Sequence, residues 1–229
     1  AKLIVADCLG AIVGGMAEPE IRMLAESEGD NVFEILDETK KVTDETISFL
    51  FGTAGTVLEM DEGHQFAKGH PGMHIFPALL AAARNKEFSG EEFLRAFIIG
   101  YDVGARIGLA SNLNPTMHPH GTWGGLGAAA GLAVMNKMNA RESSEYLNIV
   151  SSLTLATSRK TMLEGATVRN SYTGVSNKMA HVGLMLLKAG FTGEQDGIKS
   201  IFGSVVSNKF DDKSAVELLG KRFEVSRNY

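Results

Sequence analysis

The stretch Ser89-Gly-Glu-Glu-Phe-Leu-Arg-Ala-Phe-Ile-Ile-Gly-Tyr-Asp-Val-Gly-Ala-Arg-Ile-Gly108 has the features of one long amphipathic helix. Ser89 and Glu92 are spaced as in a capping box, in which each side chain satisfies a free backbone N–H at the start of a helix. Apolar side chains follow at helical spacing and would form one buried face. They are Phe93, Phe97, Tyr101 and Ile107. The sequence therefore predicts a helix from residue 89 to residue 107.

The same helical period recurs along most of the chain, whereas β-branched residues that alternate with polar ones are scarce. Thr43-Asp-Glu-Thr46 begins a further helix, with acids in its first turn that complement the helix dipole. Pro71 suits the first turn of another helix, which runs to Arg84. The remaining helices are expected at residues 121–131, 142–158, 172–189 and 213–219. This pattern predicts an all-α fold.

Small residues are concentrated in two of these helices. Gly100, Gly104 and Gly108 recur at four-residue spacing, and residues 121–131 are nearly all glycine and alanine. Glycine inside a helix costs about 0.5–1 kcal/mol relative to alanine. Its repeated use indicates close helix–helix approach that recovers the loss through packing. We therefore expect a multi-helix bundle with tight Gly/Ala-mediated crossings.

Composition limits the class of protein. The chain has 229 residues, of which 44% are hydrophobic, and this length suits one domain over residues 1–229. The net charge of −5, without a Lys/Arg-rich run, argues against a nucleic-acid partner. No apolar run reaches membrane-spanning length. The one cysteine, Cys8, cannot form a disulfide within the chain, which favours the cytoplasm. We expect a cytoplasmic globular protein that binds neither nucleic acid nor membrane.

Five of the six histidines fall in two short segments. Residues 59–74 read Glu-Met-Asp-Glu-Gly-His-Gln-Phe-Ala-Lys-Gly-His-Pro-Gly-Met-His, and residues 117–123 read Met-His-Pro-His-Gly-Thr-Trp. Carboxylates and imidazoles are costly to bury unless they are paired and hydrogen-bonded. Their concentration beside apolar helices indicates either a solvated loop or a shaped polar cavity.

A set of motifs spread along the chain resembles the MmgE/PrpD family, in that family's order and approximate spacing. The motifs are Asp7-Cys-Leu-Gly10, Glu59-Met-Asp-Glu-Gly-His64, His70-Pro-Gly72, Ser89-Gly90, Gly100-Tyr101, His118-Pro119, Gly127-Ala-Ala-Ala130 and Gly190-Phe-Thr-Gly193. The resemblance is to the helical domain of this family, whose members include 2-methylcitrate dehydratase, cis-aconitate decarboxylase and iminodisuccinate epimerase. It covers most of the chain.

The resemblance implies an active site without cofactor or metal that moves a proton beside a carboxylate of a small polycarboxylate. It places the family's active-site histidines at His70 and His118, and we expect them to transfer protons or orient the substrate, with Asp61 as their charge partner. The motif positions also place Glu59, His64 and Arg169 among the expected substrate-binding residues, and we add Lys68 as a second carboxylate binder beside Arg169. Histidine and acid pairs also suit this chemistry on general grounds, because proton abstraction needs a base whose pKa is near neutral.

This sequence departs from the family pattern at several positions. The family's acidic motif, Asp-x-Asp-Asp-Thr-His, becomes Glu59-Met-Asp-Glu-Gly-His64, so a hydroxyl donor is replaced by Gly63. Arg169 stands where the family commonly has lysine. Arginine retains carboxylate binding as a bidentate fork but is a poor proton donor. These departures indicate a substrate that differs from those of the named family members.

Other interpretations of the histidines compete with this assignment. His74 follows His70 by four residues, which is also the spacing of a zinc pair, although the matching Glu is absent and Pro71 crowds the turn. We expect no metal. His120 is interpreted as a capping or packing residue, Trp123 as core and His181 as a buried, hydrogen-bonded histidine. Arg159-Lys160 is interpreted as a solvated helix end or as a loop near the substrate.

The resulting hypothesis is a lyase, a hydro-lyase that resembles 2-methylcitrate dehydratase and acts on a small polycarboxylate without a cofactor. An isomerase, epimerase or decarboxylase of the same family is the alternative within enzymes. From another class, the chain is a non-catalytic helical module that binds a small acid or dimerises. A homodimer is expected in each case. The family's second α/β domain, a lid over the site, has no counterpart here, so the chain is either a fragment of a longer two-domain protein or works without the lid.

Overall fold

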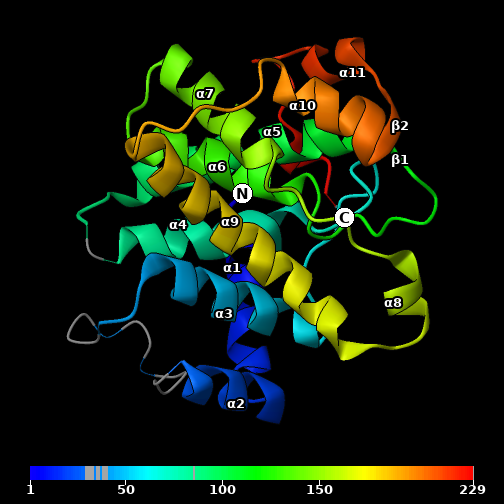
Figure 1. Ribbon diagram of the computed structural model, residues 1–229. Helices are drawn as coiled ribbons and strands as arrows, with labels where there is room; N and C mark the ends of the chain where they lie inside the picture. Colours follow the sequence, from blue (N-terminus) through cyan, green and yellow to red (C-terminus); the bar gives the residue numbers. More distant parts are fainter. Residues whose placement is uncertain (29–33, 35–36, 38–40, 85, 229) are drawn as a thin grey trace.

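The computed structural model describes residues 1–28, 34, 37, 41–84 and 86–228 (Figure 1). Helices account for most of this part of the chain. In order they are α1 (Lys2–Gly15), α2 (Pro19–Ser27), α3 (Asp44–Val57), α4 (Pro71–Ala83), α5 (Gly90–Ala110), α6 (Gly124–Met135), α7 (Ala140–Ser151), α8 (Arg159–Leu163), α9 (Tyr172–Lys188), α10 (Gly197–Ser200) and α11 (Asp212–Val216). None of them combines the length and hydropathy that a bilayer span requires, within the described residues.

Local sequence signals explain how the main helices begin. The capping box predicted for α5 is present: the Glu92 N–H donates to Ser89 Oγ and the Ser89 N–H donates to Glu92 Oε2. Thr43 caps α3 by accepting from the Thr46 N–H. Pro71 is the first residue of α4. These predictions are confirmed because each depends on neighbours within one turn of helix.

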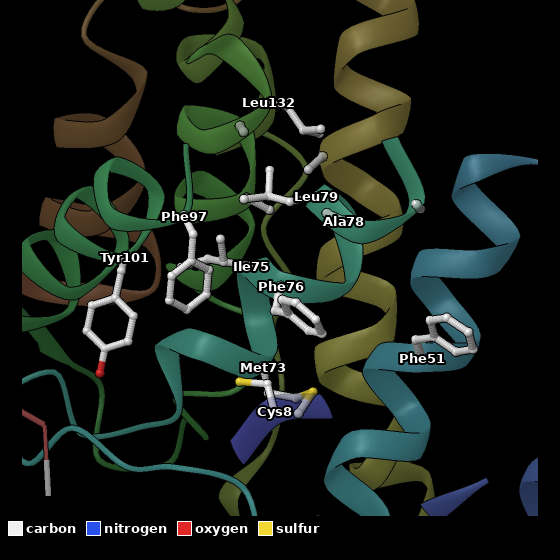
Figure 2. Close-up of a cluster of buried hydrophobic side chains, with 14 of the residues drawn as sticks. Cys8, Phe51, Met73, Ile75, Phe76, Ala78, Leu79, Phe97, Tyr101 and Leu132 are labelled. Atoms are coloured by element: carbon white, nitrogen blue, oxygen red, sulfur yellow. The ribbon is translucent and has the colours of Figure 1, made fainter. Parts of the chain in front are cut away.

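The core is organised around α4, which contacts α1, α3, α5, α6 and α9. Figure 2 shows the buried cluster to which α4 contributes Met73, Ile75, Phe76, Ala78 and Leu79. Phe97 of α5 is fully buried beside Phe76, with ring centroids 6.5 Å apart. Each such apolar side chain contributes about 1.5–3 kcal/mol on burial. The start of α4 is thereby anchored in the core, and the predicted site residue His70 directly precedes it.

Two helix crossings are tight because glycines face each other. A Cβ on Gly100 of α5 would lie 2.7 Å from the Gly127 carbonyl oxygen of α6, and a Cβ on Gly52 of α3 would lie 2.7 Å from Gly174 Cα of α9. Real Cβ atoms do not approach other atoms so closely, so no larger residue fits at these positions. The predicted Gly/Ala crossing is therefore found between α5 and α6.

The all-α prediction missed a small sheet. β1 (Ser111–Leu113) pairs antiparallel with β2 (Ser207–Phe210), and Asn112 Nδ2 donates to Asn208 Oδ1 across the pair at 2.7 Å. Strands of three and four residues are too short to display the alternation that identifies a strand in a sequence. The fold is mostly helical rather than entirely so.

The predicted helix at residues 142–158 was wrong at its C-terminal end, because α7 ends at Ser151. The following segment is extended and pairs with the loop before α6: the His118 N–H donates to the Thr157 carbonyl, and the Leu155 N–H donates to the Gly121 carbonyl. Helix α11 likewise covers 212–216 rather than 213–219. Helices α2, α8 and α10 were not predicted.

Candidate active site

A cleft of about 570 Å³ opens where the loop before α4, the loop before α6 and the segment around α8 meet. None of the described residues that line it is acidic, although the whole chain carries a net charge of −5. The lining residues are Gln65, Lys68, Gly69, His70, Leu113, Asn114, Pro115, Met117, His118, Pro119, His120, Arg159, Met162 and Arg169. Three of them, Lys68, Arg159 and Arg169, have basic side chains, so the cleft suits an anionic ligand.

His70 and Asp61 form a pair at the wall of this cleft. His70 is the N-cap residue of α4, where Pro71 fixes the direction of the chain. His70 Nδ1 faces two acceptors, Asp61 Oδ2 at 3.0 Å and the Asp61 carbonyl oxygen at 3.2 Å. Since both are acceptors, Nδ1 carries the proton and Nε2 keeps its lone pair. This is the arrangement of an oriented general base.

The pKa of His70 is raised above its ordinary value. Burial alone would lower the pKa, but the contact with Asp61 and the charges of Asp61 and Glu62 outweigh the loss of hydration. The Asp61 side chain is buried, whereas a quarter of the His70 side chain remains exposed. His70 can therefore accept a proton and hold it as an imidazolium beside a fixed carboxylate.

His118 differs from His70 in that its pKa is lowered. Its Nδ1 accepts from the His120 N–H at 3.1 Å, so a neutral ring carries its proton on Nε2. Burial and the nearby His70 and Arg159 charges lower the pKa of His118 to about 4. The hydroxyl of Thr157 donates to the His118 and His120 carbonyl groups and fixes this loop. His118 is therefore a neutral hydrogen-bond donor at neutral pH.

Both ring nitrogens of His74 have partners within the protein. Its Nδ1 contacts the His70 carbonyl oxygen at 2.8 Å and its Nε2 accepts from the Gly121 N–H at 3.2 Å. Gly124 makes room for this ring, because a Cβ at Gly124 would overlap it. With both nitrogens engaged, His74 positions the two site loops and has no lone pair free to act as a ligand.

Three cations reach the cleft from different elements. Lys68 is exposed and has a left-handed backbone, with φ of 59°. Arg159 is exposed at the start of α8 and forms no ion pair with the described residues. Arg169 is buried, pairs with Glu59 and leaves its Nε without a partner. Three basic side chains that are far apart in the sequence therefore line one cleft.

The structure does not bring His64 to the cleft lining. The His64 side chain is fully buried, its Nδ1 accepts from the Ala67 N–H at 3.0 Å, and its Nε2 lies 3.4 Å from the buried carboxylate of Glu224. Arg222 and Arg227 form ion pairs with the same carboxylate. His64 thus attaches the acidic loop to the C-terminal segment. Glu59 also lies outside the lining, where it holds Arg169.

Glu62 is a structural acid that the site prediction did not include. Its carboxylate accepts from the Tyr101 hydroxyl and the Gly72 N–H, while its own N–H donates to Asp7 Oδ2. Desolvation raises the pKa of Glu62 to about 7 despite these hydrogen bonds. It therefore links α1, α4 and α5 directly behind His70.

The other predicted residues lie where packing arguments place them. Trp123 is fully buried, and His181 is buried with Nε2 3.2 Å from the Ala78 carbonyl oxygen. Arg159 is exposed and also lines the cleft, so both interpretations of the Arg159-Lys160 pair describe part of its setting. Among the described residues, no three His, Cys, Asp or Glu side chains are grouped so that they could hold a metal ion.

Comparison with known protein families identifies a relationship over most of the chain. The profile of the MmgE/PrpD N-terminal domain matches residues 1–213. Comparison with curated proteins gives no significant match.

Proposed function

The chain belongs to the MmgE/PrpD family, and from this premise and the geometry of the cleft we propose that it is a lyase that eliminates water from a small polycarboxylate. His70 is the base. Its Nε2 removes the proton from the carbon next to a substrate carboxylate, and Asp61 stabilises the imidazolium that forms. A base of this kind contributes typically 10²–10⁴-fold to the rate.

The negative charge that develops on the substrate carboxylate is stabilised by cationic and neutral donors. Lys68, Arg159 and Arg169 line the cleft, and the Nε2–H of neutral His118 adds a hydrogen bond without a charge. Arg169 and His118 are buried and held by other residues, so they need not reorganise during the reaction, which makes them effective. The absence of acids among the described lining residues avoids repulsion of the anion.

Elimination can be completed by the same imidazole. After the C–H bond breaks, a C=C bond forms as the C–O bond breaks, and His70 returns its proton to the departing hydroxide. Water leaves and His70 is neutral again, so the step balances without another acid. His118 is a poor second base, because its Nδ1 already accepts a hydrogen bond and its pKa is about 4. This asymmetry favours elimination over a two-base epimerisation.

The main support for the proposal is that His70, which pairs with the buried Asp61, lines a cleft with three cations and, among its described residues, no acid. The homodimer, the cytoplasmic location and the interpretation of residues 1–229 as one domain that lacks a lid stay predictions.

The test is incubation of the purified protein with hydroxylated and non-hydroxylated polycarboxylates, with products followed by NMR. The proposal expects olefinic proton signals from the hydroxylated acids and their loss in His70→Gln. Inversion of a stereocentre without an olefin would instead support an epimerase, and loss of a carboxylate as carbon dioxide a decarboxylase. Calorimetric binding without any product would support a binding module.

A further inference from the structure

The imidazole of His120 lacks a partner in a site where the other histidines have one. The His120 side chain is 2% exposed, and its Nδ1 is fully buried without a hydrogen bond. Its backbone is engaged, since the His120 N–H donates to His118 and its carbonyl accepts from Thr157. Most buried polar atoms in native proteins are hydrogen-bonded, so this exception needs an explanation.

The ring of His120 lies at the centre of the histidine cluster. Its centroid is 4.8 Å from that of His70, 5.2 Å from that of His74 and 4.6 Å from that of His118. His120 also lines the cleft. It therefore borders both the base and the neutral donor of the proposed reaction.

A purely packing role, as the sequence suggested, does not require a nitrogen at this position. An apolar side chain of similar volume would fill the same space without leaving a buried polar atom unpaired. His181 shows the contrast: it is buried to a similar extent, but its Nε2 has the Ala78 carbonyl as a partner. His120 carries a polar group that the fold itself does not use.

The chemistry of a neutral imidazole differs from that of the neighbouring cations. Burial and the surrounding histidines lower the pKa of His120 well below its ordinary value, so the ring stays neutral. A neutral imidazole can accept a hydrogen bond from a hydroxyl group, whereas Lys68, Arg159 and Arg169 can only donate. The cations suit the carboxylates of a substrate, and the imidazole suits its hydroxyl group.

We propose that His120 is a specificity-determining residue that hydrogen-bonds the hydroxyl group of the bound acid, so that the cleft selects hydroxylated polycarboxylates over the same acids without the hydroxyl. This inference rests on the proposed function, because it assigns the group that would leave. A site that pairs with a substrate hydroxyl discriminates against the analogue that lacks it, since its polar atom is then left unpaired.

The test compares two probes that differ in one hydroxyl group, citrate and propane-1,2,3-tricarboxylate, by calorimetric titration. Wild-type protein should bind citrate about 5- to 10-fold more tightly, as expected for one neutral hydrogen bond. In His120→Leu the ratio of dissociation constants should fall to about 1. His120→Asn, which keeps a polar atom near the position of Nδ1, should retain part of the preference.

The matched control is His181→Leu, which removes a buried imidazole outside the cleft. It should keep the citrate preference but lower the melting temperature, because it loses the contact with Ala78. His120→Leu should do the reverse and leave the melting temperature unchanged or higher. A preference for citrate that persists in His120→Leu, or a wild-type protein that does not prefer citrate, would overturn the inference.

The measurements distinguish a failure of the role of His120 from a failure of the proposed lyase function. If the wild-type protein prefers citrate through His120 but forms no olefin from any hydroxylated acid, the specificity inference stands and the lyase proposal fails. If it forms an olefin while both probes bind equally, the lyase proposal stands and the role of His120 fails.

Discussion

Replacement of Asp61 by Asn should separate the base from the carboxylate that orients it. Asp61 Oδ2 lies 3.0 Å from His70 Nδ1, and the Asp61 side chain is fully buried. Asn has nearly the same size but carries no charge. The imidazolium that forms when His70 takes the substrate proton would therefore lose its counter-charge, while the packing of the loop is kept.

The magnitude follows from the kind of contact. A hydrogen bond to a charged group is worth about 1.5–3 kcal/mol, and 1.4 kcal/mol corresponds to a factor of ten in rate. We therefore expect kcat of Asp61→Asn to fall about 10- to 150-fold. The pKa of His70 is raised by Asp61, so the variant should also need a lower pH to protonate its base. The rise of activity with pH should move to lower pH.

The assay is the pH profile of kcat for wild type, Asp61→Asn and the control Asp7→Asn. Asp7 accepts from the Glu62 N–H at 2.8 Å and therefore supports the same loop, but it does not contact His70. Asp7→Asn should leave the position of the pH profile unchanged. An unchanged profile and kcat in Asp61→Asn, with the fold intact, would refute the role of the pair.

Three further predictions concern charge and stability. The pKa of Glu62 is raised to about 7, so the folded state binds more protons than the unfolded state between about pH 4.5 and 7 and loses stability as pH rises. The stability of Glu62→Gln relative to wild type, measured by urea unfolding, should therefore be greater at pH 8 than at pH 5. The pKa of His74 is lowered to about 4, so the unfolded state binds more protons, and the folded protein loses about 3 kcal/mol of stability as pH falls from 6.5 to 4. His74→Gln should lose less stability over this interval. An equal loss in the variant and the wild type would contradict the lowered pKa of His74. Arg159→Met should raise KM more than it lowers kcat, and an NMR titration should find the pKa of His118 shifted upward, because the Arg159 charge contributes to lowering it.

The parts of the fold that sequence reasoning predicted depend on neighbouring residues. The capping box of α5 and the start of α3 are local signals, and both are present in the structure. The extended segment after Ser151 was missed because its partners are about forty residues away: Thr157 accepts from His118, and Leu155 donates to Gly121. Pairing between distant segments leaves no period in the sequence of either one.

The same distinction applies to the site. Chemistry and the resemblance were enough to select His70, His118, Lys68 and Arg169, which the fold brings to one cleft. His64 has similar neighbours in the sequence, yet it lies outside the lining beside Glu224, 160 residues later. The contact with Glu224 decided the difference, and this contact depends on where the C-terminal segment packs. The sequence could not predict that Nδ1 of His120 lacks a hydrogen bond either, because the partners of a buried atom depend on the assembled fold.

The most direct test of the central claim follows hydrogen at the reacting carbon. In heavy water, NMR can measure how fast deuterium enters the carbon next to a carboxylate of a bound polycarboxylate. We expect exchange by the wild-type protein and a loss of at least about 100-fold in His70→Gln, the lower end of what a general base contributes. Equal exchange rates in the two proteins would contradict the assignment of His70 as the base.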